Sequence, residues 1–277
     1  MIALRRLSFA RILVIAALAL LALLFFIPLI WMVLSSFKTN SEIFTTPFSL
    51  PTQVDFTQWA VAWDVGNISR YALNSVIVTT VSVLAILGLS SAAAFAFSRY
   101  RFRGAGLMLG LLSLGLILPL QSYFIAQSTM FTQLELTDTY WALIIPYTAM
   151  GLPLATYLLK VYLDALPEEL FEAARIDGAG DLRIYLMLAL PLLKPGLATV
   201  AVFSALSCWN EFLLALLYIQ DDSLKTIPTG LLAFSSRYVT DYSLLFSALS
   251  IITLPMIAVY IVFNRQITEG ITAGSLK

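Results

Sequence analysis

Apolar residues fill six long stretches of this 277-residue chain, and short polar segments separate them. A helix needs about 20 mainly apolar residues to cross the hydrocarbon core of a bilayer, and each stretch is long enough to do so. The first stretch is far longer than the roughly 7 to 15 apolar residues of a cleavable signal peptide, so we interpret it as a retained anchor. The predicted spans are about 12–34, 71–97, 104–126, 139–162, 196–219 and 241–264.

Composition supports the same fold class. Hydrophobic residues make up 60% of the chain and charged residues 12%, whereas soluble domains carry roughly 25% charged residues. We therefore expect an all-α integral membrane protein that forms a single transmembrane domain over residues 1–277. The formal net charge is zero, so no basic field favours nucleic acid as a partner.

Residue types also exclude several kinds of chemistry. The chain has no histidine and one cysteine, which excludes a disulfide framework, a histidine-based metal site and a Cys/His nucleophile pair. The cysteine, Cys208, lies in an apolar run, where we expect it to be a small buried hydrophobic residue.

The distribution of lysine and arginine predicts the orientation, because basic residues near span ends favour the cytoplasm. With both termini inside, the outer segments hold only Lys38, Arg70, Lys225 and Arg237. The inner segments then hold the other twelve of the sixteen basic residues: Arg5, Arg6, Arg11, Arg99, Arg101, Arg103, Lys160, Arg175, Arg183, Lys194, Arg265 and Lys277.

The first outer segment, residues 35–70, contains the string "DFTQWAVAW". Asp55 and Gln58 have the spacing of a capping box, and the aromatic residues that follow share one helical face. This pattern predicts an interfacial helix with tryptophans at headgroup depth. We favour simple anchoring over a platform for a ligand.

The densest cluster of acids lies in the long inner segment, residues 163–195. From Asp164 to Asp181 it holds one base, Arg175, and six acidic residues: Asp164, Glu168, Glu169, Glu172, Asp177 and Asp181.

Local signals in this segment predict two short helices. Pro167 suits a first helical position, and the glutamates that follow it favour the positive end of a helix dipole. Gly178 can take the left-handed conformation that ends a helix. We therefore predict a helix over about 167–177, a Gly-Ala-Gly turn, and a second helix from near Asp181 to Leu190 that Pro191 and Pro195 end.

Three roles compete for the first of these helices. A helix lying on lipid is disfavoured, because interfacial helices are typically basic and an anionic leaflet repels acids. A solvated connector and a docking element for a soluble partner are both compatible with the composition. In a docking element, Ala173 and Ala174 would allow close approach and Glu172 would pair with a basic residue.

The string "EAARIDGAG" and the later "LP" resemble the EAA motif of ABC importer permeases, which reads E-A-A, three residues, G, nine residues and I-x-L-P. The first half fits at Glu172, Ala173, Ala174 and Gly178. The second half fits at Leu188, Leu190 and Pro191, with Leu188 in place of the usual isoleucine. Under this resemblance docking is strongly favoured over a connector.

Other strings narrow the resemblance to the permeases of carbohydrate (maltose-type) importers. They are "SSFK", "TYWALIIP", "CWNEFLLAL", "DDSLKTIPTGLLAF" and the C-terminal "RQITEGITAGSLK". The resemblance implies a type I ABC importer permease fold with six spans in the bacterial cytoplasmic membrane. Both termini and a coupling helix would lie on the cytoplasmic side.

The family resemblance also implies partners and site residues. A second permease, a dimer of ABC ATPases and an extracytoplasmic solute-binding protein would complete the transporter, and the substrate would be a sugar or polyol. The chain has no Walker A sequence, so ATP and Mg²⁺ would bind to the ATPase and this subunit would not be an enzyme. The residues implied to contact the ATPase or shape the coupling loop are Glu172, Ala173, Ala174, Asp177, Gly178 and Gly180. For Asp177, a contact and a helix-end cap are equally compatible.

A carboxylate within a span is costly, and Glu211 is therefore a functional candidate together with Asn210. They could line the substrate path or hold helices together by hydrogen bonds. Gln121, Ser122 and Tyr123 at the outer end of the third span are further path candidates. The main alternative function, an ion- or proton-coupled secondary transporter, needs buried charged relays, and Glu211 is the only clear acid within a span.

Overall fold

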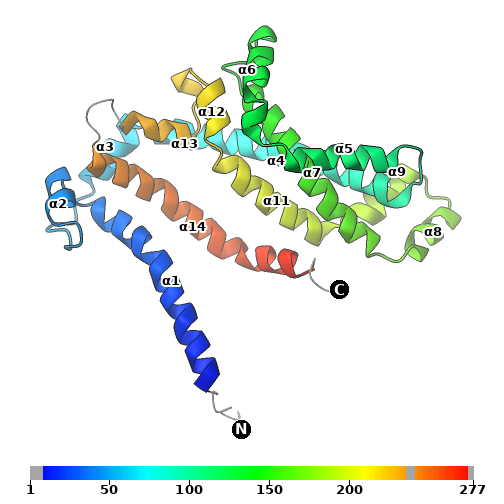
Figure 1. Ribbon diagram of the computed structural model, residues 1–277, viewed down its shortest axis with the longest axis horizontal. Helices are drawn as coiled ribbons and strands as arrows, with labels where there is room; N and C mark the ends of the chain where they lie inside the picture. Colours follow the sequence, from blue (N-terminus) through cyan, green and yellow to red (C-terminus); the bar gives the residue numbers. More distant parts are fainter. Residues whose placement is uncertain (1–8, 235–240, 274–277) are drawn as a thin grey trace. The chain divides into compact units, whose positions relative to one another are not determined.

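The structure, a computed structural model, describes the backbone of residues 9–234 and 241–273 and the side chains of residues 13–234, 241–257 and 261. Every regular element in these ranges is helical (Figure 1). The chain forms two compact units. One comprises Met1–Ile68 and Leu231–Met256, and the other Ser69–Gly230 and Ile257–Lys277.

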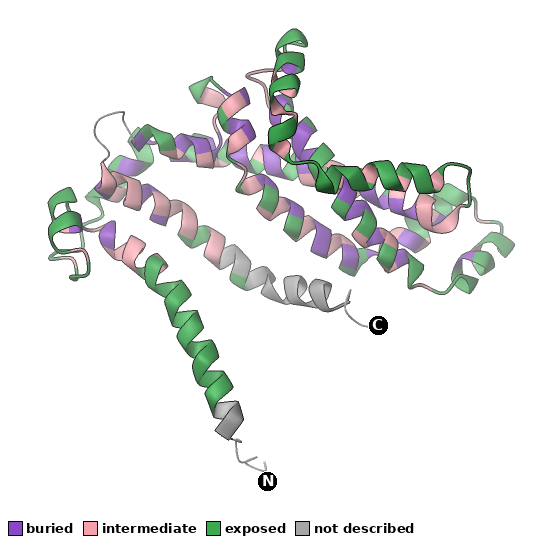
Figure 2. Cartoon of the chain, in the orientation of Figure 1, coloured by how far each residue is buried: buried purple, intermediate pink, exposed green. Residues whose placement is uncertain are grey.

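The first unit includes the apolar helix α1. Its residues from 13 to 30 are exposed apart from the half-buried Leu29, as expected of a helix that faces lipid or another subunit (Figure 2). The helices of this unit are α1 (Phe9–Ser35), α2 (Asn40–Thr45), α3 (Thr57–Val65), η4 (Leu231–Phe234) and the first part of α14 (Tyr242–Ala273).

A buried lysine fixes the segment that follows α1. Lys38 is 2% exposed, and its ammonium group donates to the carbonyl oxygens of Thr46 at 3.1 Å and Pro47 at 3.0 Å. The indole of Trp31 donates to the same Pro47 carbonyl at 2.8 Å. These bonds satisfy the buried charge and hold the backbone of the turn after α2.

A helix is present near residue 56 as predicted, α3, but its N-terminal signal is different. Asp55 accepts hydrogen bonds from the backbone and hydroxyl of Thr57 at 2.9 and 2.6 Å, and α3 has no side-chain cap of the capping-box kind. Trp59 stacks on Phe37, with ring centroids 5.5 Å apart. This tryptophan therefore packs within the unit, while Trp63 remains 44% exposed.

The second unit contains the predicted coupling loop and both groups of candidate residues. Three long helices, α4, α7 and α11, form its centre. Its elements are α4 (Ile68–Arg99), α5 (Ala105–Ile117), η1 (Leu120–Ser122), α6 (Phe124–Gln133), α7 (Trp141–Asp164), α8 (Glu169–Ile176), α9 (Asp181–Ile184), the π-helical turn η2 (Tyr185–Ala189), α10 (Leu190–Leu192), α11 (Lys194–Trp209), α12 (Leu213–Tyr218), η3 (Asp222–Leu224) and α13 (Ile227–Gly230).

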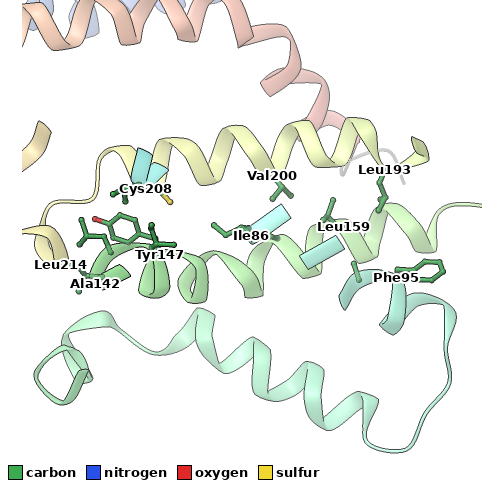
Figure 3. Packing of buried hydrophobic residues seen from close by; sticks show 14 of the residues in the cluster. Ile86, Phe95, Ala142, Tyr147, Leu159, Leu193, Val200, Cys208 and Leu214 are labelled. Atoms are coloured by element: carbon green, nitrogen blue, oxygen red, sulfur yellow. The ribbon is translucent and has the colours of Figure 1, made fainter. Parts of the chain in front are cut away.

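Buried aliphatic side chains join these three helices. Ile86 of α4, Leu159 of α7 and Val200 of α11 belong to one buried cluster that runs along α7 (Figure 3). Gly151 marks a close approach of α7 to α4, because a Cβ atom there would lie 2.4 Å from the end of the Ile86 side chain. Because glycine has no side chain, the Ile86 side chain of α4 can pack directly against the backbone of α7.

The observed helices match some predicted spans and break others. Within the described residues, three helices are long and apolar enough to cross a membrane: Leu13–Ser35, Ile68–Arg99 and Trp141–Asp164. A further pair, Asp181–Leu192 and Lys194–Trp209, meets the same test if its 74° bend is counted as one span. The six-span topology with both termini inside stays a prediction.

Two predicted spans are interrupted. The span predicted over 104–126 is divided at Leu118 and Pro119, which are extended, with ψ values of 118° and 138°. A residue before proline is pushed out of the α region, so α5 ends at Ile117 after 13 residues. The span predicted over 196–219 is divided between α11 and α12.

A buried asparagine organises the segment after α12. Asn74 of α4 is 2% exposed, and its amide donates to the carbonyls of Ser223 at 3.0 Å and Lys225 at 2.8 Å. Its own oxygen accepts from the hydroxyl of Tyr140 at 2.8 Å. One side chain thus fixes α4, the start of α7 and the segment around η3 to one another.

Replacing this asparagine tests that arrangement. Asn74→Ala leaves the Lys225 carbonyl and the Tyr140 hydroxyl without this partner and removes one donor from the Ser223 carbonyl. We expect a loss of about 2 kcal/mol in the free energy of unfolding. Hydrogen exchange at the amides of residues 223–227 should speed up, and thermal unfolding in detergent should occur at a lower temperature.

Arg70→Gln is the matched control. The Arg70 side chain also donates to the Ser223 carbonyl, at 3.1 Å, but at an exposed position. We expect its effect to stay within about 0.5 kcal/mol. Equal effects of the two substitutions would contradict the central role of Asn74.

Candidate functional site

The acidic segment between α7 and α11 forms the predicted pair of short helices. The first, α8, spans Glu169–Ile176 and lies inside the predicted range of 167–177. Glu169 and Glu172 fall in its first turn, where the helix dipole favours negative charge. The second begins at Asp181 as predicted, but it continues through η2 and α10 to Leu192.

Gly178 ends α8 in the way the sequence indicates. Its φ is +78°, and a Cβ atom there would meet nothing within 4 Å, so the backbone conformation alone favours glycine. The amides of Gly178 and Ala179 donate to the carbonyls of Arg175 and Ala174, each at 3.0 Å. This is a Schellman motif, which satisfies carbonyls that the helix end would leave free.

Gly180 has a different role from the one the spacing indicates. Its φ is −72° and its ψ 161°, an extended conformation open to any residue, and it precedes α9 as its N-cap. The turn back of the chain therefore depends on Gly178 and not on Gly180. Asp177 occupies the C-cap position of α8 with an exposed side chain, so its two roles both stay open.

The two alanines of the motif face different surroundings. Ala173 is exposed, whereas Ala174 is half-buried and packs against the core of its own chain. Phe171 is fully buried at 1% exposure and fixes the orientation of α8. Positions 171 and 174 share one helical face, and the buried Phe171 turns this face inward. The docking role of Ala173 and Ala174 stays a prediction.

The outward face of α8 carries an apolar residue that the sequence did not single out. Ile176 is 87% exposed, and Leu170 is 43% exposed. Glu172 is exposed as well. A signal was available, because an isoleucine five residues after a buried phenylalanine lies on the opposite side of a helix.

The chain bends after the second short helix and then continues as α11. Pro191 lies within α10 and does not end it, contrary to the expected break. The π-helical turn η2 directly precedes it, and such turns accommodate a residue that lacks the backbone N–H. The 74° change of direction occurs at Leu193, before α11 begins at Lys194.

Glu211 lies at the break between α11 and α12 and acts as a cap. Its carboxylate accepts from the amides of Leu214 at 2.9 Å and Ala215 at 3.2 Å, and from the hydroxyl of Tyr147 at 2.7 Å. The first two bonds satisfy free N–H groups at the start of α12, and the third ties this break to α7. The side chain of Asn210 donates to the carbonyl of Leu206 at 2.8 Å, within its own helix end.

A half-open cleft of about 200 Å³ reaches this carboxylate. Its walls come from α4, α7 and α11, and most of its lining is apolar. The polar groups are gathered near Glu211 and Tyr147 and include Ser204, Ser207 and Cys208. Cys208 is buried as expected, at 8% exposure.

The other path candidates lie apart from this cleft. Gln121 and Ser122 are exposed on η1, and Tyr123 follows it half-buried. None of the three belongs to the cleft lining. The structure therefore brings Glu211 and Asn210 together at one helix break and leaves Gln121 and Tyr123 at another.

The sequence matches one protein family over most of its length. The profile of the family "Binding-protein-dependent transport system inner membrane component" matches residues 85–272. This range includes α8, the bend before α11 and the cleft.

Individual relatives agree with this match. The diacetylchitobiose uptake system permease protein NgcG of Streptomyces coelicolor is 36% identical, with 95% of this chain and 87% of the relative covered. The trehalose/maltose transport system permease protein MalG of Thermococcus litoralis is 32% identical, with 96% of this chain and 97% of the relative covered.

A solved structure has the same fold. One chain of a bacterial ABC transporter involved in the import of the acidic polysaccharide alginate superposes with a TM-score of 0.81 at 21% identity, and covers 96% of this chain and 99% of its own. This chain therefore belongs to the family of binding-protein-dependent transport system inner membrane components, the permease subunits of ABC importers.

Proposed function

We propose that this chain is a permease subunit of an importer that takes up a sugar or related polyol across the bacterial cytoplasmic membrane. A solute-binding protein outside the membrane delivers the substrate, and a second permease completes the pore. The names of the relatives, which concern diacetylchitobiose and trehalose or maltose, support the carbohydrate class.

The observation that carries the proposal is the way α8 is held. Its C-terminal end is closed by the amides of Gly178 and Ala179, and Phe171 is its one fully buried residue. Its remaining surface presents acids and an exposed isoleucine. A surface of this kind suits a cleft in a soluble partner better than it suits an anionic leaflet.

We assign the coupling role to this surface. Glu172 pairs with a basic residue of an ABC ATPase, Ala173 permits close approach, and Ile176 fills an apolar depression. Gly178 shapes the end of the helix, and Ala174 supports it from below. ATP and Mg²⁺ bind to the ATPase, so this subunit carries no catalytic residue.

Thermodynamics limits how ATP drives such a transporter. A ligand shifts a two-state equilibrium only by its difference in affinity for the two states, and a shift from 1:99 to 99:1 takes about 5.5 kcal/mol. ATP therefore binds the closed ATPase dimer much more tightly than the open dimer. Because the ATPase holds α8, the preference of ATP for the closed dimer also favours one conformation of the membrane subunit.

For the substrate path we retain Asn210, Glu211, Gln121 and Tyr123 as proposed residues. The cleft beside Glu211 supports that residue most directly, because polar groups on an apolar wall suit a sugar, which has both hydroxyls and apolar faces. The three hydrogen bonds at Glu211 also disfavour the ion-coupled alternative, because they engage both carboxylate oxygens.

Reversing the charge at Glu172 tests the docking surface. In Glu172→Lys, an interfacial ion pair becomes a repulsion, and we expect the ATPase to co-purify at least about tenfold less well while membrane insertion is unchanged. ATP hydrolysis by the purified complex should fall in parallel. The control is Glu135→Lys, the same change at an exposed position after α6. A fully assembled and active Glu172→Lys complex would remove the coupling assignment.

A second test addresses the apolar contact. Ile176→Ser removes a side chain that is 87% exposed in this subunit, so the stability of the isolated chain should change little. If the ATPase buries that side chain, its affinity should fall by about 2 kcal/mol, or about thirtyfold. A titration of the membrane subunits with purified ATPase measures this. Leu182→Ser, at a 70% exposed position on α9, is the control outside α8.

A third test separates the two roles of Glu211. Glu211→Ala leaves two amides and a hydroxyl unpaired and should lower the free energy of unfolding by about 3 kcal/mol. Tyr147→Phe removes one of the three bonds and should cost about 1 kcal/mol. Thermal unfolding in detergent checks both values. If the carboxylate also contacts substrate, Glu211→Gln should reduce uptake of the sugar that the cognate binding protein retains. This reduction should exceed what the loss of stability alone accounts for.

A further inference from the structure

Arg99, the last residue of α4, contacts two other elements at once. Its Nη2 atom donates to the backbone carbonyl of Leu163 and, at 3.3 Å, to that of Leu166. Its Cζ atom lies 3.8 Å from the centroid of the Phe171 ring. The three partners belong to the end of α7, the turn after it, and α8.

The chemistry of these contacts suits arginine in particular. The carbonyl end of a helix carries partial negative charge, which a cation stabilises. The face of an aromatic ring attracts the same cation. A guanidinium group is flat, so it donates in its plane to the carbonyls while its face lies on the ring, and a lysine cannot do both.

Neighbouring residues on the same end of α4 add to the connection. Ser98 donates to the Asp164 carboxylate at 2.7 Å. Phe95 lies 6.4 Å from the Phe171 ring and 5.4 Å from the Tyr185 ring, centroid to centroid.

The connection extends to the second short helix. Ser91 and the Tyr185 hydroxyl are 2.8 Å apart and share a hydrogen bond. Tyr100, just beyond α4, bonds to Asp181, and burial together with this carboxylate raises the pKa of its hydroxyl. We call Ser91, Phe95, Ser98 and Arg99 the α4 joint.

We propose that the α4 joint transmits displacement of α8 to α4 and the end of α7, and that Arg99 is its main positioning residue. Phe171 is the fully buried residue of α8, and Arg99 and Phe95 both contact its ring. A pull on α8 therefore acts on α4 directly and not only through the covalent chain. This inference rests on the proposed role of α8 in coupling to an ATPase.

The native cysteine provides a reporter for this transmission. Cys208 lines the cleft between α4, α7 and α11, and it is the chain's one cysteine. Movement of α4 against α11 changes the access of a thiol reagent to it. The rate of its modification by a methanethiosulfonate reagent, read by mass spectrometry of this subunit, therefore reports movement without knowledge of the sugar.

The experiment uses the complete transporter in lipid, with and without ATP and vanadate. In the unaltered complex, trapping with ATP and vanadate should change the rate of Cys208 modification. In Arg99→Gln the ATPase should still co-purify and still trap vanadate, but the change in rate should shrink about fivefold, as expected when a cation–π contact at a partly buried position is lost. Arg99→Lys should restore part of the response. Arg103→Gln, at an exposed position on the next loop, should leave it unchanged.

Phe171→Leu gives a second test that keeps an apolar side chain in the buried site. It should reduce the response as Arg99→Gln does, and a fully responsive, assembled Phe171→Leu or Arg99→Gln complex would overturn the proposal.

Failure of the proposed coupling function would give different results. If the unaltered complex shows no response to ATP, or if Glu172→Lys assembles normally, the coupling role of α8 falls and the joint falls with it. Loss of assembly in Glu172→Lys with a normal response in Arg99→Gln would reject the joint alone.

Discussion

Free backbone groups at chain breaks are the constraint on which this structure depends. In an apolar chain each unpaired N–H or carbonyl is costly, and few polar side chains are available to pair with them. Three charged residues do so here. Lys38 binds carbonyls of the turn after α2, Arg99 binds carbonyls at the end of α7, and Glu211 binds amides at the start of α12. Each charge is satisfied mainly by the backbone and not by a counter-ion.

The same hydrogen bonds also restrain the positions of the helices. A charge that bonds to the end of another helix fixes that helix end in place. Arg99 thereby connects α4 to α7 and α8, and Glu211 connects α12 to α7 through Tyr147. Two connections of this kind lie near opposite ends of α7, with the cleft between α7 and α11 in the same unit. A displacement of α8 is therefore carried by contacts that also stabilise the fold.

Much of the structure of the acidic segment between α7 and α11 could be predicted from the sequence, because its signals are local. Gly178 has the positive φ that its position after an acidic helix indicates, and α8 lies within the predicted range. The family match agrees with the EAA motif. The direction of each side chain could not be predicted, since Ala174 faces inward only because Phe171 finds a site beside Phe95 and Arg99. That site is formed by residues more than 70 positions earlier in the chain.

The breaks within the predicted spans could not be predicted from the sequence. Hydropathy over a window of about 19 residues averages across a single extended residue, so the interruption at Pro119 was hidden by the apolar residues around it. Glu211 was recognised as costly, and both a structural and a functional role were open to it. Its partners are the amides three and four residues later and a tyrosine from α7, which periodicity cannot identify. Sequence thus locates a buried charge well and its partner poorly.

The size of α8 explains why its supports matter for function. A helix of eight residues is too short to be stable in water by itself. The Schellman turn at Gly178, the buried ring of Phe171 and the Arg99 guanidinium supply the missing stability from the rest of the subunit. Because these contacts order the helix before any partner arrives, less entropy is lost on docking. Under the proposed coupling role, a partner that binds Glu172 and Ile176 would also act on α4 and α7, since a helix that cannot persist alone cannot move independently of its supports.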